Sequence, residues 1–564
     1  MRLLSLITCP RLRSSQQPGG DGELFKPLTT AAQRGTAQCT TAQGSATIRL
    51  HRVVAQLLAC AALLALVAGC ATAPTRNAAP QSRWQLADSD TPLGRLPALH
   101  QLADGRSAFR PLLQPLNALQ TRLAVIQQAR VAIDMQTYQL ADDTTGRELL
   151  RALADAGDRG VRVRLLIDDF HALGLDQLLL GLVAHPGVEV RMYNPFTSGR
   201  DSLLPRLLSL VGDFSQLNRR MHNKLLVADG RVAIVGGRNL TDAYYMRSGE
   251  ANFLDIELLG IGQVATALGP AFDHYWNSSY AVPVQALGSS PLDGPQRRAA
   301  FDARTYPDRR LQTGPWLAGV AAAITQLADL PLAVADAKVY FDNTAKTGGG
   351  LGSPGGGPPL PIGRLVREAR EQLVVVSPYF LPSGVGLKLL RDARQRGVDV
   401  QVLTNSLVDT DEPLVSLAYG PQRQDFLRAG LRLFEMSSEA FKREQGVRAQ
   451  LGSSVARLHA KLGLIDRQLL LIGSLNIDPR SAHTNTELAL VIASADLVSA
   501  VGQQFQPTLV RLAHEVRLAA DDQTLVWVAV DESGAEQLGT EPSLPAWRLL
   551  LLWLMARFVP DDLL

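Results

Sequence analysis

Two segments of the 564-residue chain repeat the same chemically reactive residue types at the same spacing. Each begins with a histidine followed two positions later by a lysine. Each ends with an asparagine that lies three positions after a glycine. An imidazole can act as a nucleophile or transfer protons, an ammonium group can neutralise a phosphate oxygen, and a carboxamide can donate to developing negative charge. These residue types therefore predict chemistry on a phosphate group. The residues are His222, Lys224, Asp229, Gly236, Gly237 and Asn239 in the first segment, and His459, Lys461, Asp466, Gly473, Ser474 and Asn476 in the second.

Each segment has the pattern of a β-hairpin with the reactive groups at its start. A histidine and a lysine two residues apart point to the same face of a strand. Asp229 and Asp466 fall between apolar runs, so we expect them to be turn residues and not catalytic groups. The small residues after the hairpin predict a tight backbone that returns Asn239 and Asn476 to the histidines. The expected strands start at the histidines and continue through 225–228 and 462–465, and they pair with return strands at 232–235 and 469–472.

The elements around each hairpin also repeat along the chain. In both halves a helix leads into an apolar strand, and a second helix ends in Arg-Gly-Val before the next strand. Glycine closes helices at this position, and strands that alternate with helices indicate an α/β fold. We therefore expect two tandem α/β domains, each a mainly parallel or mixed sheet flanked by helices, packed around one shared active site. The expected elements are helices at 113–129 and 145–158, strands at 131–135 and 161–167 in the first half, and strands at 373–377 and 398–402 in the second.

The first 70 residues predict a secretory signal. An apolar run from Val53 to Val67 follows a basic flank and is too short to span a membrane. Its ending, Ala68-Gly69-Cys70, resembles the lipobox of bacterial lipoproteins, which implies lipidation of Cys70; the alternatives are an ordinary cleaved signal and an apolar segment with an incidental cysteine. Ala71 after the cysteine favours the outer membrane by the sorting habit of such lipoproteins. The predicted domains are a leader at 1–69 with its signal at about 46–69, a tether at 70–106, a first domain at 107–285, a connecting segment with a Gly/Pro-rich loop at 286–361, a second domain at 362–518 and a tail at 519–564.

The composition narrows the range of possible functions further. The chain has 56 basic and 53 acidic residues, a balance that gives no support to a dedicated nucleic-acid binder. All four cysteines lie in the first 70 residues, and the sequence contains no HExxH or CxxC pattern. We therefore expect no metal and no cofactor. In the tail, Trp547, Arg548, Trp553 and Arg557 surround a leucine run, which is consistent with an interfacial helix or with a buried docking helix.

The paired motifs resemble those of the phospholipase D superfamily, which carries HxKxxxxD twice. The segments Asn218 to Lys224, Ser377 to Pro382, Thr404 to Leu407 and Pro545 to Leu564 are most similar to bacterial cardiolipin synthases of the C type. The resemblance implies that one histidine forms a phosphohistidine while the other transfers protons. It assigns His222 as the nucleophile and His459 as the general acid and base. It also implies that a carboxylate just downstream of each motif, Asp255 for the first and Glu487 for the second, holds the second ring nitrogen of its histidine.

The resemblance leaves several functions open. We expect a phosphatidyltransferase that moves a phosphatidyl group from a phospholipid donor to a phosphatidylglycerol-like acceptor and so makes cardiolipin. A phospholipase that uses water, a nuclease, and an inactive envelope scaffold are the alternatives. Gly237 stands where the second motif has Ser474, so the first half lacks that hydroxyl. We expect a membrane-associated monomer with internal pseudo-two-fold symmetry, anchored in the bacterial envelope and facing the periplasm.

Overall fold

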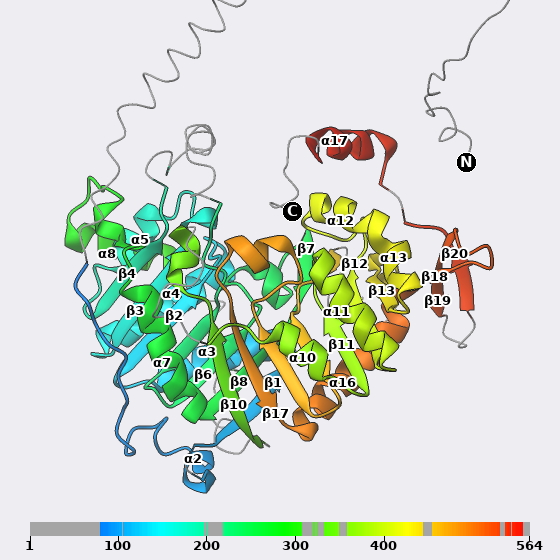
Figure 1. The fold of residues 1–564 in the computed structure, drawn as a ribbon. Helices are drawn as coiled ribbons and strands as arrows, with labels where there is room; N and C mark the ends of the chain where they lie inside the picture. The colour runs from blue at the N-terminus through cyan, green and yellow to red at the C-terminus, as the bar shows by residue number, and fades with distance from the viewer. Residues whose placement is uncertain are drawn as a thin grey trace, which may run out of the picture. The chain divides into compact units, whose positions relative to one another are not determined.

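The computed structural model describes most of the chain after residue 78. The predicted signal at 46–69 and Cys70 lie outside the described residues. Residues 71–564 form one compact unit, and its described part has a mixed α/β architecture (Figure 1). No helix in the described part is long and apolar enough to cross a membrane. The described residues are 79–103, 105–196, 200, 218–306, 319, 322–323, 332–348, 358–443, 454–530, 536–542 and 544–556.

The first half contains a mixed sheet with a parallel part and an antiparallel part. Strands β2, β3 and β4 are parallel, and the hairpin β5–β6 continues the sheet on the other side of β2. The mixed sheet agrees with the predicted fold class. In order across the sheet, the strands are β9 (Ala281–Pro283), β4 (Val188–Tyr193), β3 (Arg162–Asp168), β2 (Ala132–Thr137), β5 (Leu225–Ala228), β6 (Val232–Gly236), β8 (Glu257–Gly262) and β1 (Ser107–Leu112).

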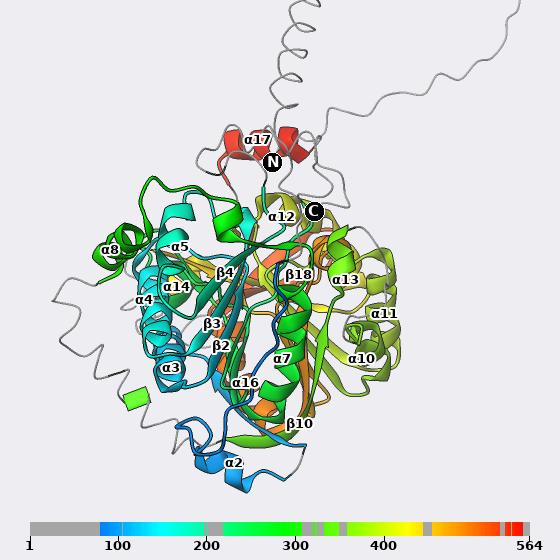
Figure 2. The same ribbon diagram turned by 90° about the vertical axis from the view of Figure 1, so that its left-hand side faces the viewer.

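Helices cover both faces of this sheet (Figures 1 and 2). Successive residues of strand β5 belong to different hydrophobic cores. Leu226 lies in the core that includes residues of helices α3 and α4, whereas Val227 lies in the core that includes residues of helix α7. The Asp143 side chain caps α4 by accepting from the Gly146 N–H, and Gly160 follows the helix with a φ of 88°. The helices are α3 (Pro115–Gln128), α4 (Thr144–Asp158) and α7 (Gln263–Trp276).

The second half repeats this arrangement. Its parallel strands are again followed by an antiparallel hairpin, and Gly397 has the same left-handed conformation as Gly160, with a φ of 91°. The two sheets join through the antiparallel pair β1–β10. In order across the sheet, the strands are β20 (Glu536–Gly539), β19 (Leu525–Val530), β18 (Ala513–Leu518), β13 (Arg432–Met436), β12 (Asp399–Asn405), β11 (Gln372–Val376), β15 (Leu462–Ile465), β16 (Leu469–Gly473), β17 (Leu488–Ala493) and β10 (Ala333–Phe341). The helices used below are α10 (Ile362–Glu368), α11 (Gly384–Gln395), α12 (Pro413–Tyr419), α16 (Ala495–Arg511) and α17 (Ala546–Ala556).

The two hairpins have the predicted strands, and their turns have the expected conformation. Asp229 and Gly230 both have positive φ, as do Asp466 and Arg467, which is the geometry of a type I′ turn. The Asp229 carboxylate also accepts hydrogen bonds from the backbone at the start of β2, including 2.8 Å from the Val131 N–H. Asp466 makes the equivalent bonds at the start of β11. Each aspartate therefore fastens its hairpin to the preceding strand.

Two predicted boundaries differ from the structure. Part of the predicted tether packs on the first half: the Trp84 N–H donates to Asp273 at 2.8 Å, Ala87 pairs with Asp229, and the Leu93 side chain is fully buried. The predicted tail contains β19 and β20, which extend the second sheet beyond residue 518. Long-range contacts of this kind leave no periodic signal in short segments, which explains why the sequence pattern placed both boundaries inside ordered structure.

Candidate active site

The two halves pair with each other at two places beside the histidines. Strand β7 (Ala251–Leu254) of the first half runs parallel to β14 (Val455–Leu458) of the second, with Leu254 opposite Leu458. Because the strands are parallel and in register, the next residues, Asp255 and His459, emerge side by side. The His459 N–H confirms the register by donating to the Leu254 carbonyl at 2.8 Å.

A second parallel bridge, between Met221 and Thr486, places His222 beside Glu487. The His222 N–H donates to the Thr486 carbonyl at 2.9 Å. In this half the reactive residues precede the strand, because β5 begins only at Leu225. The second half is alike, with β15 beginning at Leu462. The histidines and lysines therefore lie on the chain leading into each hairpin, just outside the strands in which we expected them.

Each histidine is held by a carboxylate of the other half. His459 Nδ1 lies 2.6 Å from Asp255, and His222 Nδ1 lies 3.0 Å from Glu487. The prediction that each carboxylate serves the histidine of its own motif was wrong. The cause is the pair of parallel bridges, which exchange the segments downstream of the motifs between the halves.

The small residues of the motifs contact these carboxylates. The Ser474 hydroxyl donates a short hydrogen bond to Glu487, and the Ser481 hydroxyl donates to the other oxygen of the same carboxylate at 2.7 Å. A side chain at Gly237 would collide with the carboxylate of Asp255. The absence of a hydroxyl in the first motif is thus tied to the close approach of Asp255.

Burial sets the protonation states of this site. Desolvation, together with Lys224 and Lys461, lowers the pKa of His222 and of His459 well below the usual value. Burial raises the pKa of Asp255 to about 6 and also raises the pKa of Glu487. At neutral pH both imidazoles are therefore uncharged, with the Nδ1–H donating to an ionised carboxylate and Nε2 left as the basic nitrogen.

The two lysines bring a pair of ammonium groups to the same place. Lys224 Nζ donates to the His222 carbonyl at 2.7 Å, and Lys461 Nζ donates to the His459 carbonyl at 2.6 Å. Burial lowers the pKa of Lys461 to about 8, and burial followed by the charge of Lys461 lowers the pKa of Lys224. Two lysines beside the histidines can donate to the oxygens of an anionic ligand such as a phosphodiester.

The two motif asparagines have different surroundings. Asn239 donates to the hydroxyl of Tyr244 at 2.8 Å, and Tyr244 in turn lies 3.2 Å from His459 Nε2. Asn239 thus connects to the histidine of the second half and not, as expected, to its own. The Oδ1 atom of Asn476 is buried and has no hydrogen-bond partner among the residues that the structure describes.

Tyr244 is a site residue that the sequence reasoning missed. Its ring stacks on Phe253 at 4.6 Å and meets the His459 ring edge-on at 4.9 Å. Burial raises the pKa of Tyr244 well above its usual value, so the hydroxyl keeps its proton and donates to Nε2. Tyr244 follows Asn239 by five residues, as Ser481 follows Asn476. A comparison of these equivalent positions would have drawn attention to both.

Two neutral imidazoles, two buried ammonium groups and a shared site between α/β halves define an enzyme that transfers groups at phosphodiesters. The family model described as cardiolipin synthase, PLD-like domain, matches the chain twice, at residues 123–276 and 362–509. The chain belongs to this family within the phospholipase D superfamily, and cardiolipin synthases are phosphatidyltransferases. It is an enzyme of that type.

Individual relatives agree with this membership. Cardiolipin synthase C of Escherichia coli K12 is 34% identical over 461 residues, which covers 79% of this chain and 94% of the relative. Cardiolipin synthase A of Pseudomonas syringae is 26% identical and covers 77% of this chain and 73% of the relative. The solved phosphatidylserine synthase of Haemophilus influenzae Rd KW20 has a TM-score of 0.53 at 14% identity, covering 80% of this chain and 93% of that one, which shows a common fold.

Proposed function

We propose that the protein synthesises cardiolipin by moving a phosphatidyl group from a phospholipid donor to the headgroup hydroxyl of a phosphatidylglycerol-like acceptor. The observation that carries this proposal is the pair of crossed histidine–carboxylate contacts, which leave two Nε2 atoms to act from one site. Similarity to cardiolipin synthases along most of the chain supports the choice of substrate class.

In the proposed reaction His222 Nε2 attacks phosphorus and forms a P–N bond as the bond to the donor's headgroup oxygen breaks. The negative charge of the bound phosphodiester favours uptake of a proton by His459, which then gives this proton to the leaving oxygen. Neutral His459 then removes the proton of the acceptor hydroxyl, the new P–O bond forms, and the P–N bond breaks. Lys224 and Lys461 neutralise the phosphoryl oxygens throughout.

The position of the Tyr244 hydroxyl supports this division of roles. It donates to His459 Nε2 in the resting site, so an oxygen already occupies the place from which a substrate hydroxyl would exchange its proton. In this proposal the acceptor hydroxyl replaces that of Tyr244 during the second step. The same two steps with water as acceptor would make the enzyme a phospholipase, which is the second candidate.

The test is lipid analysis of bacteria that lack their own cardiolipin synthases, carrying either this protein or its His222→Ala variant. Accumulation of cardiolipin with the wild type alone supports transfer. Phosphatidic acid without cardiolipin would support the phospholipase instead. Equal lipid profiles from both proteins would contradict the proposed roles altogether. Purified protein with labelled phosphatidylglycerol gives the same comparison without cellular lipids.

The proposed location is the periplasmic side of the cell envelope, through lipidation at Cys70 and with the outer membrane preferred. Helix α17 provides a second contact with lipid in this proposal. One stripe of this helix exposes Trp547, Leu550, Leu551, Leu554 and Met555, with Trp547 63% exposed. Figure 1 shows α17 beside α12, which follows strand β12. Apolar stripes with tryptophan favour the membrane interface, and a monomer would suffice because both motifs lie in one chain.

A further inference from the structure

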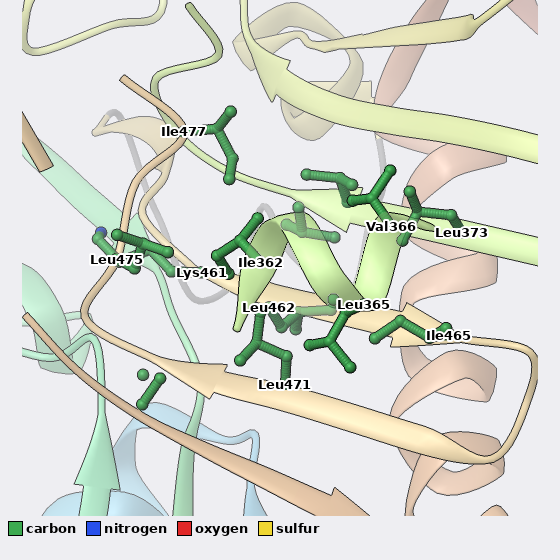
Figure 3. A pocket seen from close by; sticks show the side chains of 15 residues that line it. Ile362, Leu365, Val366, Leu373, Lys461, Leu462, Ile465, Leu471, Leu475 and Ile477 are labelled. Atoms are coloured by element: carbon green, nitrogen blue, oxygen red, sulfur yellow. The ribbon is translucent and has the colours of Figure 1, made fainter. Parts of the chain in front are cut away.

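An apolar cavity lies between helix α10 and the sheet of the second half. We call it the α10 pocket; it is lined chiefly by Ile362, Val375, Lys461, Gly463, Leu471 and Ile477, and its volume is about 50 Å³. Figure 3 shows α10 over the strands, with aliphatic side chains directed into the space between them. Among the described residues of the lining, Lys461 alone is charged.

The equivalent space in the first half is filled. There Met135, Leu226 and Ile234 form a cross-strand row and are fully buried. In the second half the matching row is Val375, Gly463 and Leu471. Residue 463 follows its motif histidine by four positions, as residue 226 does, so a glycine stands where the first half has a leucine. The loss of this side chain opens the cavity.

The covering helices differ as well. Helix α3 has 14 residues, whereas α10 has seven and ends at the position equivalent to the end of α3. The shorter helix leaves Ile362, Leu471 and Ile477 partly exposed beside the pocket. The second half therefore combines a smaller cross-strand residue with a shorter helix at one place.

The pocket adjoins the proposed active site. Lys461 lines one end of it near Leu475 (Figure 3), and its Nζ atom is bonded to the His459 carbonyl. Gly473, another lining residue, directly precedes Ser474, which contacts Glu487. The pocket and the proposed active site therefore share Lys461 and adjoin each other at Gly473.

We propose that the α10 pocket binds a segment of an acyl chain of the phospholipid whose phosphate lies between the two histidines, an inference that rests on the proposed function. The walls offer a polar ligand almost no hydrogen-bonding partner, so a buried polar group would lose its hydration without compensation. A water-sized group needs about 10–15 Å³, so the resting cavity accepts about four such groups, or a short run of methylenes. The rest of the chain would continue past Ile362 and Ile477.

The decisive variant is Gly463→Leu, which recreates the filled row of the first half. A Cβ atom at residue 463 would have its nearest neighbour at 3.5 Å, an ordinary van der Waals distance, so the backbone tolerates a side chain there. Gly502→Leu is the matched control: its Cβ would face Leu464, on the opposite face of strand β15. Turnover is compared on dioleoyl phosphatidylglycerol and on bis(4-nitrophenyl) phosphate, which has no acyl chain.

We expect Gly463→Leu to lower kcat/KM for the lipid by roughly 10- to 50-fold, from the loss of two or three buried methylenes, and to change turnover of the soluble diester less than two-fold. Gly502→Leu should leave the ratio of the two activities unchanged. The same ratio in Gly463→Leu as in the wild type, whether both activities persist or both fall, overturns the proposal.

A binding measurement separates this inference from the proposed chemistry. The His222→Ala protein is illuminated with phosphatidylglycerol that carries a diazirine in its acyl chain, and labelled peptides are mapped. Label on β11, β16 or α10 that disappears with Gly463→Leu is the expected result, and label elsewhere only would refute the pocket. Full lipid turnover by His222→Ala would instead contradict the proposed function and leave the labelling pattern interpretable.

Discussion

The crossed pairing predicts that Asp255→Asn and Glu487→Gln fail at opposite steps of the reaction. Asp255 holds His459 at 2.6 Å and Glu487 holds His222 at 3.0 Å. If His222 is the nucleophile, Glu487→Gln slows formation of the phosphohistidine. Asp255→Asn impairs proton transfer by His459, so the phosphohistidine forms from a donor with a good leaving group and then persists.

The size of each effect follows from the bond that is weakened. A hydrogen bond to a charged group contributes about 1.5–3 kcal/mol, and 1.4 kcal/mol corresponds to about a ten-fold change in rate. Each variant should therefore slow its own step by about 10- to 150-fold. In each variant the other carboxylate is unchanged, so the step that depends on it serves as a control for correct folding.

The assay is a single turnover with a labelled donor that has a nitrophenolate leaving group, followed by quantification of acid-labile protein label. Asp255→Asn and His459→Ala should accumulate label on His222, whereas Glu487→Gln and His222→Ala should show little or none. Accumulation in Glu487→Gln and loss in Asp255→Asn would refute the assignment and make His459 the nucleophile. Absence of label from all variants would remove the covalent mechanism.

Three further predictions concern pH, stability and anchoring. Because Asp255 must be ionised and has a pKa of about 6, and Lys461 must be charged and has a pKa of about 8, activity should fall below the first value and above the second; the residual activity of Asp255→Asn should lack the acid limb, and an unchanged limb would contradict this role. Asp229→Ala should lower the free energy of unfolding in urea by about 3 kcal/mol, against about 1 kcal/mol for Asp466→Ala, whose backbone donors are more exposed; equal losses would contradict the reasoning. Labelled palmitate should attach to the wild type and not to Cys70→Ala, and equal labelling would exclude the lipobox.

Features that depend on short stretches of chain were predicted from the sequence. The hairpin segments at 225–228 and 462–465 lie in β5 and β15, because short apolar runs next to turn residues are local signals. Gly160 and Gly397 have the left-handed conformation expected after a helix. The repeated motif also identified the residues that the structure brings together around the two histidines, while their catalytic roles stay predictions.

Features that depend on pairing between the halves were not predicted. Asp255 and Glu487 were named correctly as neighbours of the histidines but matched to the wrong ones. The choice of partner is made by the β7–β14 pair, which joins residues about 200 positions apart and has no signature in either strand alone. Tyr244 was missed for the same reason, since its hydroxyl acts on His459 in the other half.

The exchange of carboxylates has a consequence for how this chain can be divided or inherited. Cutting it in the Gly/Pro-rich segment at 349–357 would give two fragments, each with an intact HxKxxxxD sequence. Neither fragment would own a complete dyad, because His222 would be separated from Glu487 and His459 from Asp255. Reassembly of the fragments would restore both dyads at once. A substitution at either carboxylate therefore affects the histidine of the opposite half, so the sequences of the two repeats cannot diverge independently of each other.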